Sequence, residues 1–349
     1  MNFLWQTYLE AHGASIRDGR VISFGDPVSE LGSARSATVL SDLSHFGLIH
    51  FLGDDARSFL QGQLSCDVQQ VDSSAASYGS YCTPKGRMLA SFLIWGCSKD
   101  DGYLMQLPVA LRAGIQKRLS MYVLRAKVKL DDTSDNVIRM GVAGGHAAAL
   151  IQDLLGEIPV ESLGVLHQPH ASIICLAEDR FEIAVQPEHA PEVWEGLSRN
   201  ASPVGASCWD WLEIKAGIPV IMPATQEQFI PQMVNLDAIG GISFQKGCYP
   251  GQEIVARTHY LGKVKRRMYL ANIQPEAPET VIEAGDELFS DDMGEQSSGM
   301  VVNAAVSPDG GADLLAVAQT SSVEAGEIRW KSLDGPVLKI IPLPYAVNQ

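Results

Sequence analysis

Residues 243–257 read Ser243-Phe-Gln-Lys-Gly-Cys-Tyr-Pro-Gly-Gln-Glu-Ile-Val-Ala-Arg257 and form the most informative stretch of the chain. They place one cysteine, Cys248, between Lys246 and a basic segment that follows. A thiol becomes reactive where cations or helix N-terminal amides stabilise its thiolate. The glycines on either side of Cys248 allow tight turns or the close approach of a ligand, because glycine has no Cβ. We therefore expect chemistry or ligand binding at this segment.

The residues after Cys248 predict a helix that begins near Gly251. Glu253 and Arg257 are one helical turn apart, which supports the helix and orients the arginine. Cys248 is then expected near the helix start, with positive charge around it. The alternative is that Cys248 only fills space in the fold. His259 is nearby in sequence, but nothing in the sequence places it as a base for the thiol.

Length and composition indicate a globular chain. Its 349 residues are 46% hydrophobic and 19% charged, which suits two or three domains with sizeable cores. No secretory signal and no long apolar run is evident, so we expect a soluble, cytoplasmic protein without membrane contact. Six cysteines lie far apart without a C-x-x-C pair, which fits a reducing compartment and predicts no metal cluster.

Charge is unevenly distributed along the chain. The net charge of −15 argues against a protein that coats nucleic acid nonspecifically. Between residues 246 and 267, however, the sequence contains one acid, Glu253, and six basic residues: Lys246, Arg257, Lys263, Lys265, Arg266 and Arg267. This local excess suggests an anionic small ligand or a restricted contact with RNA. For residues 263–267 the alternative is a solvated strand face.

The order of predicted elements indicates an α+β class with antiparallel sheets. Strands, hairpins and helices alternate through the first part of the chain, and residues 36–50 read as one strand. The glycines at 141–145 lack G-x-G-x-x-G spacing, which excludes a dinucleotide-binding fingerprint. From residue 268 onward, short β-rich runs separated by turn residues predict a small β-barrel or sandwich.

Two neighbouring stretches, residues 229–237 and 241–253, resemble the YgfZ family. These are folate-binding proteins linked to iron–sulfur enzyme maintenance and tRNA modification, and they are related to the glycine-cleavage T-protein, an aminomethyltransferase. Residues 59–68, 81–87 and 216–219 carry the same resemblance. It implies a T-protein-like body in residues 1–262, built from two related α+β subdomains, and a C-terminal β-barrel in residues 263–349. A folate-sized cavity is expected in the body.

The resemblance also marks a departure from the T-protein enzyme. The T-protein segment that resembles residues 85–91 carries a pair of aspartates, one of them catalytic, whereas this chain has Ala90 and Ser91. Without a carboxylate the aminomethyl transfer loses its electrostatic stabiliser. We do not expect a classical aminomethyltransferase, and whether the protein is an enzyme at all stays open.

A folate site is implied residue by residue. Glu178 matches the place of a folate-contacting glutamate and would accept hydrogen bonds from the pterin; the alternative is an acid in an exposed hairpin turn. Gln252 and Glu253 are expected to fix the loop at the folate, and Asn235 joins the same set. An arginine of the T-protein corresponds to Glu213, with Lys215 close by, so the basic residues from Arg257 to Arg267 are the candidates for the folate tail.

The function implied is a tetrahydrofolate-binding accessory protein that supports iron–sulfur enzymes, including tRNA-thiolating ones. Cys248 would supply a reactive thiolate, and Lys246 and Arg257 would tune it. Two alternatives remain: a folate-dependent one-carbon transferase of the aminomethyl or methyl type with an unknown substrate, and an RNA-contacting adapter that uses residues 257–267. The expected partners are folate, iron–sulfur enzymes and, to a limited extent, tRNA.

Overall fold

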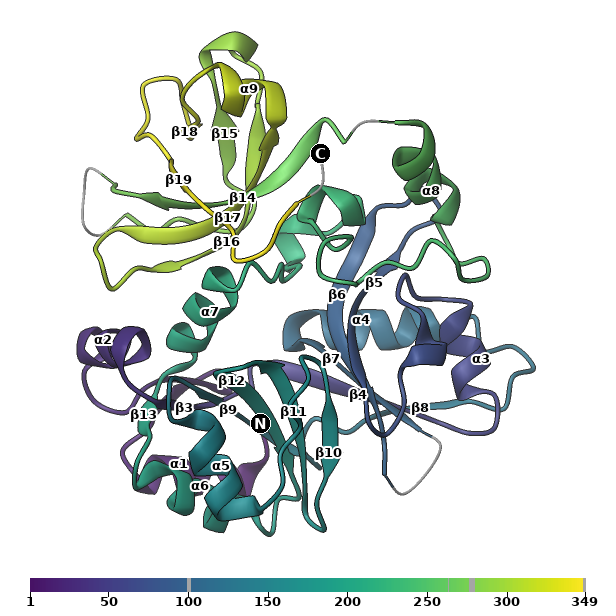
Figure 1. Cartoon of the computed structure of the whole chain (residues 1–349), viewed down its shortest axis with the longest axis vertical. Coiled ribbons are helices and arrows are strands. Elements are labelled where there is room, and N and C mark those ends of the chain that lie inside the picture. The colour runs from purple at the N-terminus through teal and green to yellow at the C-terminus, as the bar shows by residue number, and fades with distance from the viewer. Residues whose placement is uncertain (99–101, 263, 276–279, 348–349) are drawn as a thin grey trace. The chain divides into compact units, whose positions relative to one another are not determined.

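The computed structural model describes residues 1–98, 102–262, 264–275 and 280–347 (Figure 1). The chain divides into two compact units. Unit 1 comprises Met1–Leu60, Val68–Ser77 and Leu93–Trp209, and unit 2 comprises Gln61–Asp67, Tyr78–Phe92 and Asp210–Gln349. The boundary predicted between residues 262 and 263 stays a prediction. In the described residues, none of the helices combines the length and apolar character that crossing a membrane requires.

A six-stranded sheet forms the centre of unit 1. Its order is β10 (Val165–His167), β11 (Ala171–Ala177), β12 (Arg180–Val185), β9 (Ile138–Ala143), β3 (Val39–Asp42) and β13 (Ser202–Val204). All neighbouring pairs are antiparallel except β13 with β3. The predicted combination of helices with antiparallel sheets is therefore confirmed.

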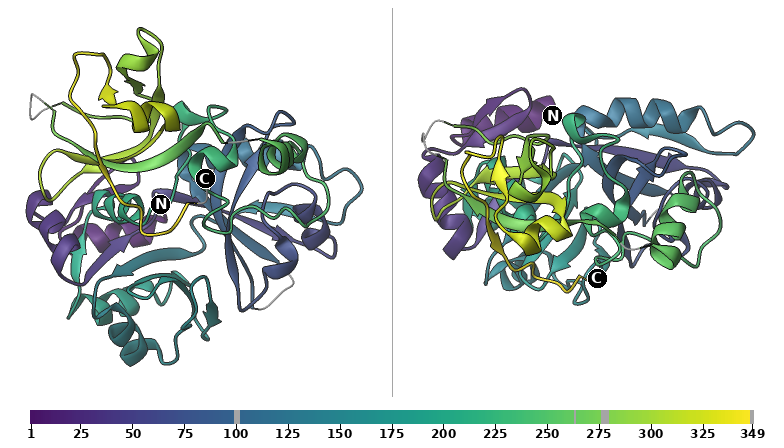
Figure 2. Two further views of the ribbon diagram at one scale, coloured as in Figure 1. Left: turned by 45° about the horizontal axis from the view of Figure 1, so that its top comes forward. Right: turned by 90° about the horizontal axis from the view of Figure 1, so that it is seen from above.

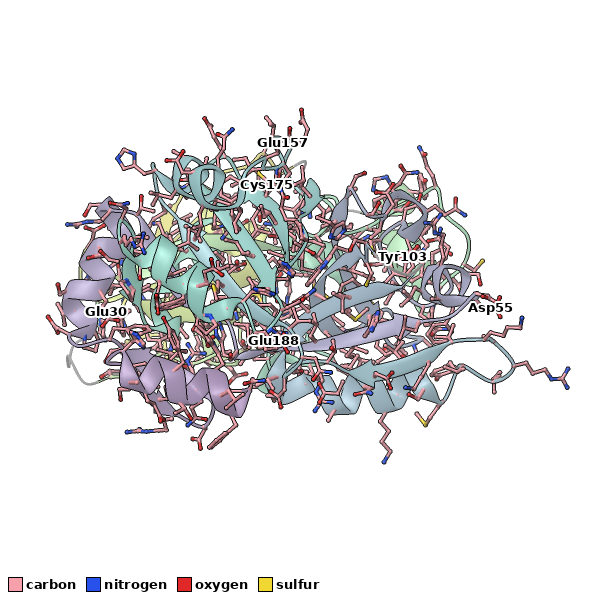
Figure 3. All side chains as sticks on the ribbon, turned by 90° about the horizontal axis from the view of Figure 1, so that it is seen from below. Glu30, Asp55, Tyr103, Glu157, Cys175 and Glu188 are labelled. Atoms are coloured by element: carbon pink, nitrogen blue, oxygen red, sulfur yellow. The ribbon has the colours of Figure 1, made fainter. Side chains whose placement is uncertain are left out.

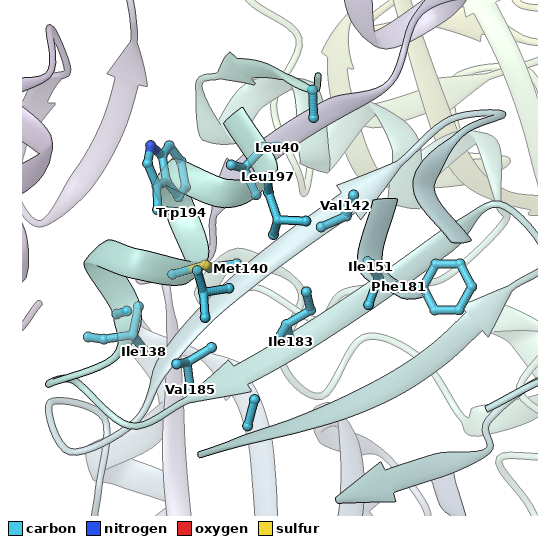
Figure 4. Packing of buried hydrophobic residues seen from close by; sticks show 14 of the residues in the cluster. Leu40, Ile138, Met140, Val142, Ile151, Phe181, Ile183, Val185, Trp194 and Leu197 are labelled. Carbon is cyan, nitrogen blue, oxygen red and sulfur yellow. The ribbon is translucent and has the colours of Figure 1, made fainter. Parts of the chain in front are cut away.

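Helices cover one face of this sheet because their apolar residues recur on one side. Trp5 and Leu9 of α1 (Phe3–Ala11), Ile151 of α5 (Ala147–Leu155), and Trp194 and Leu197 of α6 (Ala190–Ser198) share one core with the strands. Figure 4 shows the α6 side chains against strand residues of β9 and β12. Burying such side chains contributes about 1.5–3 kcal/mol each relative to leaving them in water.

The remaining elements of the N-terminal region are short. The β1–β2 hairpin (Ser15–Arg17 and Arg20–Ser23) leads into α2 (Pro27–Ser36), which Asp26 caps by accepting bonds from two backbone amides. Glu30 of α2, labelled in Figure 3, is buried, and its carboxylate accepts hydrogen bonds from the amides of Phe24 at 2.7 Å and Gly205 at 2.8 Å. These two hydrogen bonds thus fix the position of α2 within unit 1.

A second sheet runs in the order β5 (Ala76–Cys82), β6 (Met88–Gly96), β7 (Tyr103–Pro108), β4 (Phe46–Leu52) and β8 (Lys129–Asp132). α4 (Val109–Ser120) packs on β4, and α3 (Ala56–Gln61) follows β4 in the chain. β5 and β6 contribute residues to both units. The single strand predicted for residues 36–50 is wrong, because Asp42 accepts hydrogen bonds from the amide and hydroxyl of Ser44, which turns the chain between β3 and β4.

Unit 2 contains the C-terminal sheet. Its order is β18 (Arg329–Trp330), β15 (Glu287–Phe289), β16 (Gly299–Val306), β17 (Ala312–Gln319), β14 (Arg266–Ile273) and β19 (Lys339–Ile341), with α9 (Thr320–Ala325) following β17. The predicted closed β-barrel is wrong; the sheet is a curled half-barrel. In the described part of the chain Arg329 of β18 pairs with Val337, which precedes β19, in one isolated bridge, and no ladder joins the two short edge strands.

Two further helices belong to the site region. α7 (Ala206–Lys215) connects the units in sequence, and α8 (Gln252–Leu261) follows the Cys248 segment. Figure 2 shows α8, in green, from two further directions. The 3-10 turns at Val68–Gln70, Pro223–Thr225, Pro231–Val234 and Asp291–Met293 complete the regular structure.

Candidate functional site

Two glycines bring the Cys248 segment onto the turn between β5 and β6. Gly251 has a φ of +83°, a conformation that side chains disfavour. A Cβ at this position would lie 2.5 Å from the carbonyl oxygen of Thr83 and 2.6 Å from the Cα of Gly86. Only glycine fits this contact, and α8 begins at the next residue. Two motifs that are far apart in sequence therefore form one site in unit 2.

Lys246 anchors the same segment to residues 61–67. Its Nζ donates hydrogen bonds to the carbonyl oxygens of Leu64 at 2.7 Å and Cys66 at 2.8 Å, and lies 5.2 Å from the centre of the Tyr249 ring. Burial lowers the pKa of Lys246 from its usual 10.5 to about 8, while Cys66 and Asp67 oppose the shift. Lys246 thus holds the segment in place, and its tuning of Cys248 stays a prediction.

Cys248 is the exposed cysteine of the site. Cys66, Cys82, Cys175 and Cys208 are buried, whereas the Cys248 side chain is open to solvent, three residues before the N-cap of α8. Burial raises the pKa of the Cys82 thiol to about 12, which makes that thiol a poor nucleophile. Among the described residues, no group of three or more His, Cys, Asp or Glu side chains is placed to hold a metal ion. The accessible thiol at this site is Cys248.

Helix α8 carries the other predicted residues beside Cys248. Gln252 is half-buried, and its amide Nε2 donates to the carbonyl oxygen of Lys246 at 3.3 Å, which joins the helix start to the loop. Glu253 and Arg257 are exposed. The buried Gln232 holds the helix in place, because its Nε2 donates to the carbonyl oxygen of Val255 at 2.6 Å. The side chains of Glu253 and Arg257 are therefore presented to solvent by a fixed helix.

Asn235 occupies a structural position. It is fully buried, adopts a left-handed φ of 57°, and ends the 3-10 turn at Pro231–Val234. Its Nδ2 donates to the carbonyl oxygen of Met268 in β14 at 2.8 Å. This contact ties the turn to the C-terminal sheet, and the predicted contact of Asn235 with folate stays a prediction.

The basic residues between Arg257 and Arg267 differ in exposure and in whether they already have an internal partner. Arg267 is buried, and its guanidinium binds the carboxylate of Asp237 at 2.8 Å and the carbonyl oxygen of Gln232 at 2.8 Å. Lys263 lies outside the described residues. Lys265 is exposed and Arg266 half-buried. Arg267 is thus committed to an internal ion pair, which leaves Arg257 and Lys265 as the exposed cations of the described part of this run.

Lys215, the basic residue close to Glu213, also has an internal partner. Its Nζ lies 3.6 Å from the carboxylate of Asp313, which accepts a further hydrogen bond from the indole of Trp211 at 2.8 Å. Asp313 is buried, so these contacts fasten α7 to β17 inside unit 2. Glu213 is buried on the same helix.

The segment predicted to contact folate places its two glutamates in opposite environments. Glu178 lies in the exposed turn between β11 and β12. Glu182, on β12, is 1% exposed and accepts a hydrogen bond from Nε2 of Gln106 on β7 at 2.8 Å. Arg139 of β9 is equally buried, and its NH2 group donates to the carbonyl oxygen of Phe46 on β4. A polar layer therefore lies between the two sheets of unit 1.

Sequence reasoning missed Glu182, although the strand pattern contained the signal. Phe181, Ile183 and Val185 belong to the core beneath the helices, so the residues that alternate with them face the other side of the sheet. An acid at such a position, inside a strand that is buried on both faces, is rare without a specific partner. Glu182 is the carboxylate of this segment that is shielded from water.

The positions that the T-protein resemblance marks as catalytic carry no acid here. Ala90 and Ser91 are both buried on β6. Ser91 Oγ accepts a hydrogen bond from the amide of Ile221 at 2.9 Å. The serine thus satisfies a backbone donor, and neither residue could supply the charge that a carboxylate brings.

Comparison with known proteins places the chain in a family. The family described as the GCVT N-terminal domain matches residues 21–242. The glycine cleavage system aminomethyltransferase T of Bartonella henselae superimposes with a TM-score of 0.76 over 98% of this chain and 96% of that structure, at 18% identity, which shows the fold alone. The fold and the family match thus define a T-protein-like body with a GCVT domain.

Relatives of the full length narrow this class. The chain is 33% identical over 328 residues to the "tRNA-modifying protein YgfZ" of Enterobacter sp. (strain 638), covering 93% of this chain and 98% of that protein. It is 32% identical over 327 residues to the protein of the same name from Klebsiella pneumoniae (strain 342), covering 92% and 97%. The chain belongs to the YgfZ family.

Proposed function

We propose that this protein is a tetrahydrofolate-binding accessory protein that supports tRNA modification through Cys248. The observation that carries the proposal is the exposed thiol of Cys248 on a segment held by Lys246 and Gly251. These two anchors, the half-buried Lys246 and the buried Gly251, preorganise the exposed cysteine for a contact with another molecule. The names of the relatives support the tRNA-modification role.

Iron–sulfur enzymes that thiolate tRNA are the proposed clients. A single cysteine cannot hold an iron–sulfur cluster, because clusters take several thiolate ligands. Cys248 would therefore act together with a ligand or thiol from another molecule. Its exposure allows this intermolecular contact, since a partner can reach the sulfur without unfolding the segment.

Folate binding is proposed for unit 1. The GCVT domain match and the T-protein-like fold support it. A pterin presents amino and ring N–H groups, and a carboxylate away from water binds such a donor edge strongly. Glu182 has this environment, whereas Glu178 is exposed to water that competes for its oxygens. We therefore propose Glu182 as the pterin-binding carboxylate. Ala90 and Ser91 leave folate without the acid that aminomethyl transfer requires.

The test replaces Cys248 by alanine in cells that lack the wild-type protein, with thiolated nucleosides in total tRNA as the measurement. We expect the thiolated fraction to fall while the purified variant unfolds at the wild-type temperature, because an exposed side chain contributes little to stability. Cys97→Ala is the matched control, since Cys97 is half-buried in unit 1. Thiolation that stays at the wild-type level in the folded Cys248→Ala variant would refute the role.

A further inference from the structure

An aromatic cluster joins the end of α8 to Phe244 of the Cys248 segment. The rings of Phe244 and His259 stack with centroids 3.8 Å apart and planes 13° from parallel. The Tyr260 ring stands at 78° to the His259 ring with a centroid distance of 4.8 Å, and the residue is 64% exposed. An exposed aromatic side chain supported by two others is uncommon on a solvated helix, because burial would normally remove it from water.

Exposed cations occur on α8 and close to its two ends, on a chain whose net charge is negative. Arg257 is exposed on α8, one turn before Tyr260, and Lys265 is exposed shortly after the helix. Lys85 is exposed in the turn that packs against Gly251. Glu253 is the exposed acid of α8. With a net charge of −15 over the chain, this positive surface is a local property and predicts an anionic partner.

Exposed rings with flanking cations match the chemistry of single-stranded RNA. Successive bases stack on aromatic side chains, while lysine and arginine bind the phosphates between them. A paired A-form helix offers phosphates but keeps its base faces stacked inside. The net negative charge of the protein would repel a long duplex. A short unpaired segment engages both the rings and the cations without requiring a large basic surface.

The cluster is held rigidly enough to bind a strand in a defined place. Phe244 is anchored through its neighbour, because the amide of Ser243 donates to the carbonyl oxygen of Ser65 at 2.9 Å. The contact of Gly251 with Gly86 and the bond from Gln232 to Val255 fix the helix that carries His259 and Tyr260. Preorganised aromatic groups lose little side-chain freedom when a base stacks on them.

We infer that the α8 surface formed by Phe244, His259, Tyr260 and Arg257 binds an unpaired RNA segment of the tRNA substrate. The inference rests on the proposed function for the identity of the RNA, and it goes beyond it in assigning a binding surface. Because Phe244 and Cys248 belong to one segment, RNA bound here is held near the exposed thiol. An unpaired loop of the tRNA supplies both bases and phosphates.

The experiment measures the binding of a fluorescein-labelled single-stranded poly(U) oligonucleotide, and of a duplex RNA of equal length, to the full chain. We expect the single strand to bind more tightly. Tyr260→Ala should raise its Kd about fivefold or more, because stacking on one base is lost. Arg257→Gln should lower the slope of log Kd against log salt by about 0.7, the loss expected for one phosphate contact with a single strand.

Two variants on another exposed surface serve as matched controls. Tyr122→Ala and Arg125→Gln remove an exposed tyrosine and an exposed arginine from the loop after α4 in unit 1, and both should bind like the wild type. The inference is overturned if poly(U) does not bind, if the duplex binds as tightly, or if Tyr260→Ala leaves Kd unchanged. Loss of binding in the controls as well would also overturn it.

The same set separates this inference from the proposed function. Cys248→Ala should bind poly(U) like the wild type, since the thiol is not part of the aromatic cluster. If Cys248→Ala binds RNA normally but tRNA thiolation in cells is unaffected, the proposed role of the thiol fails and the RNA surface stands. If Tyr260→Ala binds RNA normally while Cys248→Ala loses thiolation, the RNA surface fails and the proposed function stands.

Discussion

Gly251 lies so close to Gly86 that a Cβ on Gly251 would approach the Gly86 Cα to 2.6 Å. A Cβ on Gly86, in turn, would lie 3.0 Å from the Cβ of Ile254. Both residues have positive φ angles, so any other residue at either position is disfavoured by the backbone conformation as well as by the lack of space. This contact is what places α8 and the Cys248 segment on the β5–β6 turn.

Gly251→Ala should therefore destabilise the protein. The left-handed backbone conformation costs a non-glycine residue about 1–2 kcal/mol, and the backbone contacts with Thr83 and Gly86 add to it. We expect the free energy of unfolding to fall by at least about 2 kcal/mol in urea denaturation.

Gly247→Ala is the control within the same segment. A Cβ at Gly247 meets no atom within 4 Å. Its free energy of unfolding should stay within about 0.5 kcal/mol of the wild type, as for most surface substitutions. Equal losses in the two variants would show that the close contact does not determine stability here.

The lowered pKa of Lys246 makes the free energy of unfolding depend on pH. Its pKa of about 8 in the folded protein lies below the usual 10.5. Between these two pH values the unfolded chain holds the proton and the folded protein does not. The unfolded state binds more protons, so the contribution of Lys246 to stability rises as pH increases through this window.

The measurement compares urea denaturation of the wild type and Lys246→Met between pH 7 and about 10.5. The free energy of unfolding of the wild type, minus that of the variant, should increase as pH rises. This holds whatever the difference is at pH 7. A second readout is the pH of half-maximal acylation of the amine, which should lie near 8 for Lys246. Lys127, whose pKa is raised by its hydrogen bond with Asp54, should be acylated only at higher pH. Parallel stability curves would contradict the lowered pKa.

The start of helix α8 was predictable from the sequence because its determinants are local. Gly251 and the charged pair Glu253 and Arg257 marked the start of α8, which the structure places at Gln252–Leu261. Sequence did not predict the partner of Lys246, since the carbonyl oxygens of Leu64 and Cys66 are about 180 residues away and backbone acceptors leave no trace in residue types.

The predicted barrel was wrong because tertiary structure decides between local alternatives. Closure of the C-terminal sheet depends on the pairing of short edge strands, which no strand pattern encodes, so a barrel and an open curled sheet look alike in sequence. In the β11–β12 hairpin, Glu178 and Glu182 are four residues apart, and the turn residues alone do not show which one is buried. Strand alternation distinguishes them once the hairpin register is known.

Glu182→Gln should weaken tetrahydrofolate binding, measured by titration of the intrinsic tryptophan fluorescence. Replacing the carboxylate removes charge-assisted hydrogen bonds that contribute about 1.5–3 kcal/mol, so we expect a rise in Kd of roughly tenfold or more. Glu178→Gln is the control, because its side chain is exposed in the turn. Weaker binding in Glu178→Gln, with Glu182→Gln folded and unaffected, would reverse the assignment.

Tyr249→Phe and Tyr345→Phe form a pair that tests the packing around Lys246 and Gly217. Both hydroxyls are removed from mostly buried rings. Tyr345 OH donates to the carbonyl oxygen of Gly217 at 2.7 Å, so Tyr345→Phe should lose about 1 kcal/mol of unfolding free energy. Among the described residues, no hydrogen-bond partner reaches the buried hydroxyl of Tyr249, and burial raises the pKa of that phenol.

Removing a buried hydroxyl that lacks a partner relieves a desolvation cost of about 1–3 kcal/mol. Tyr249→Phe should therefore unfold at the same urea concentration as the wild type or at a higher one, while the ring stays beneath the ammonium of Lys246. A clear loss of stability in Tyr249→Phe would show that the hydroxyl is bonded in solution. If stability is kept but tRNA thiolation falls, the hydroxyl acts beside Cys248 on a molecule that binds there, because its removal costs the folded protein nothing.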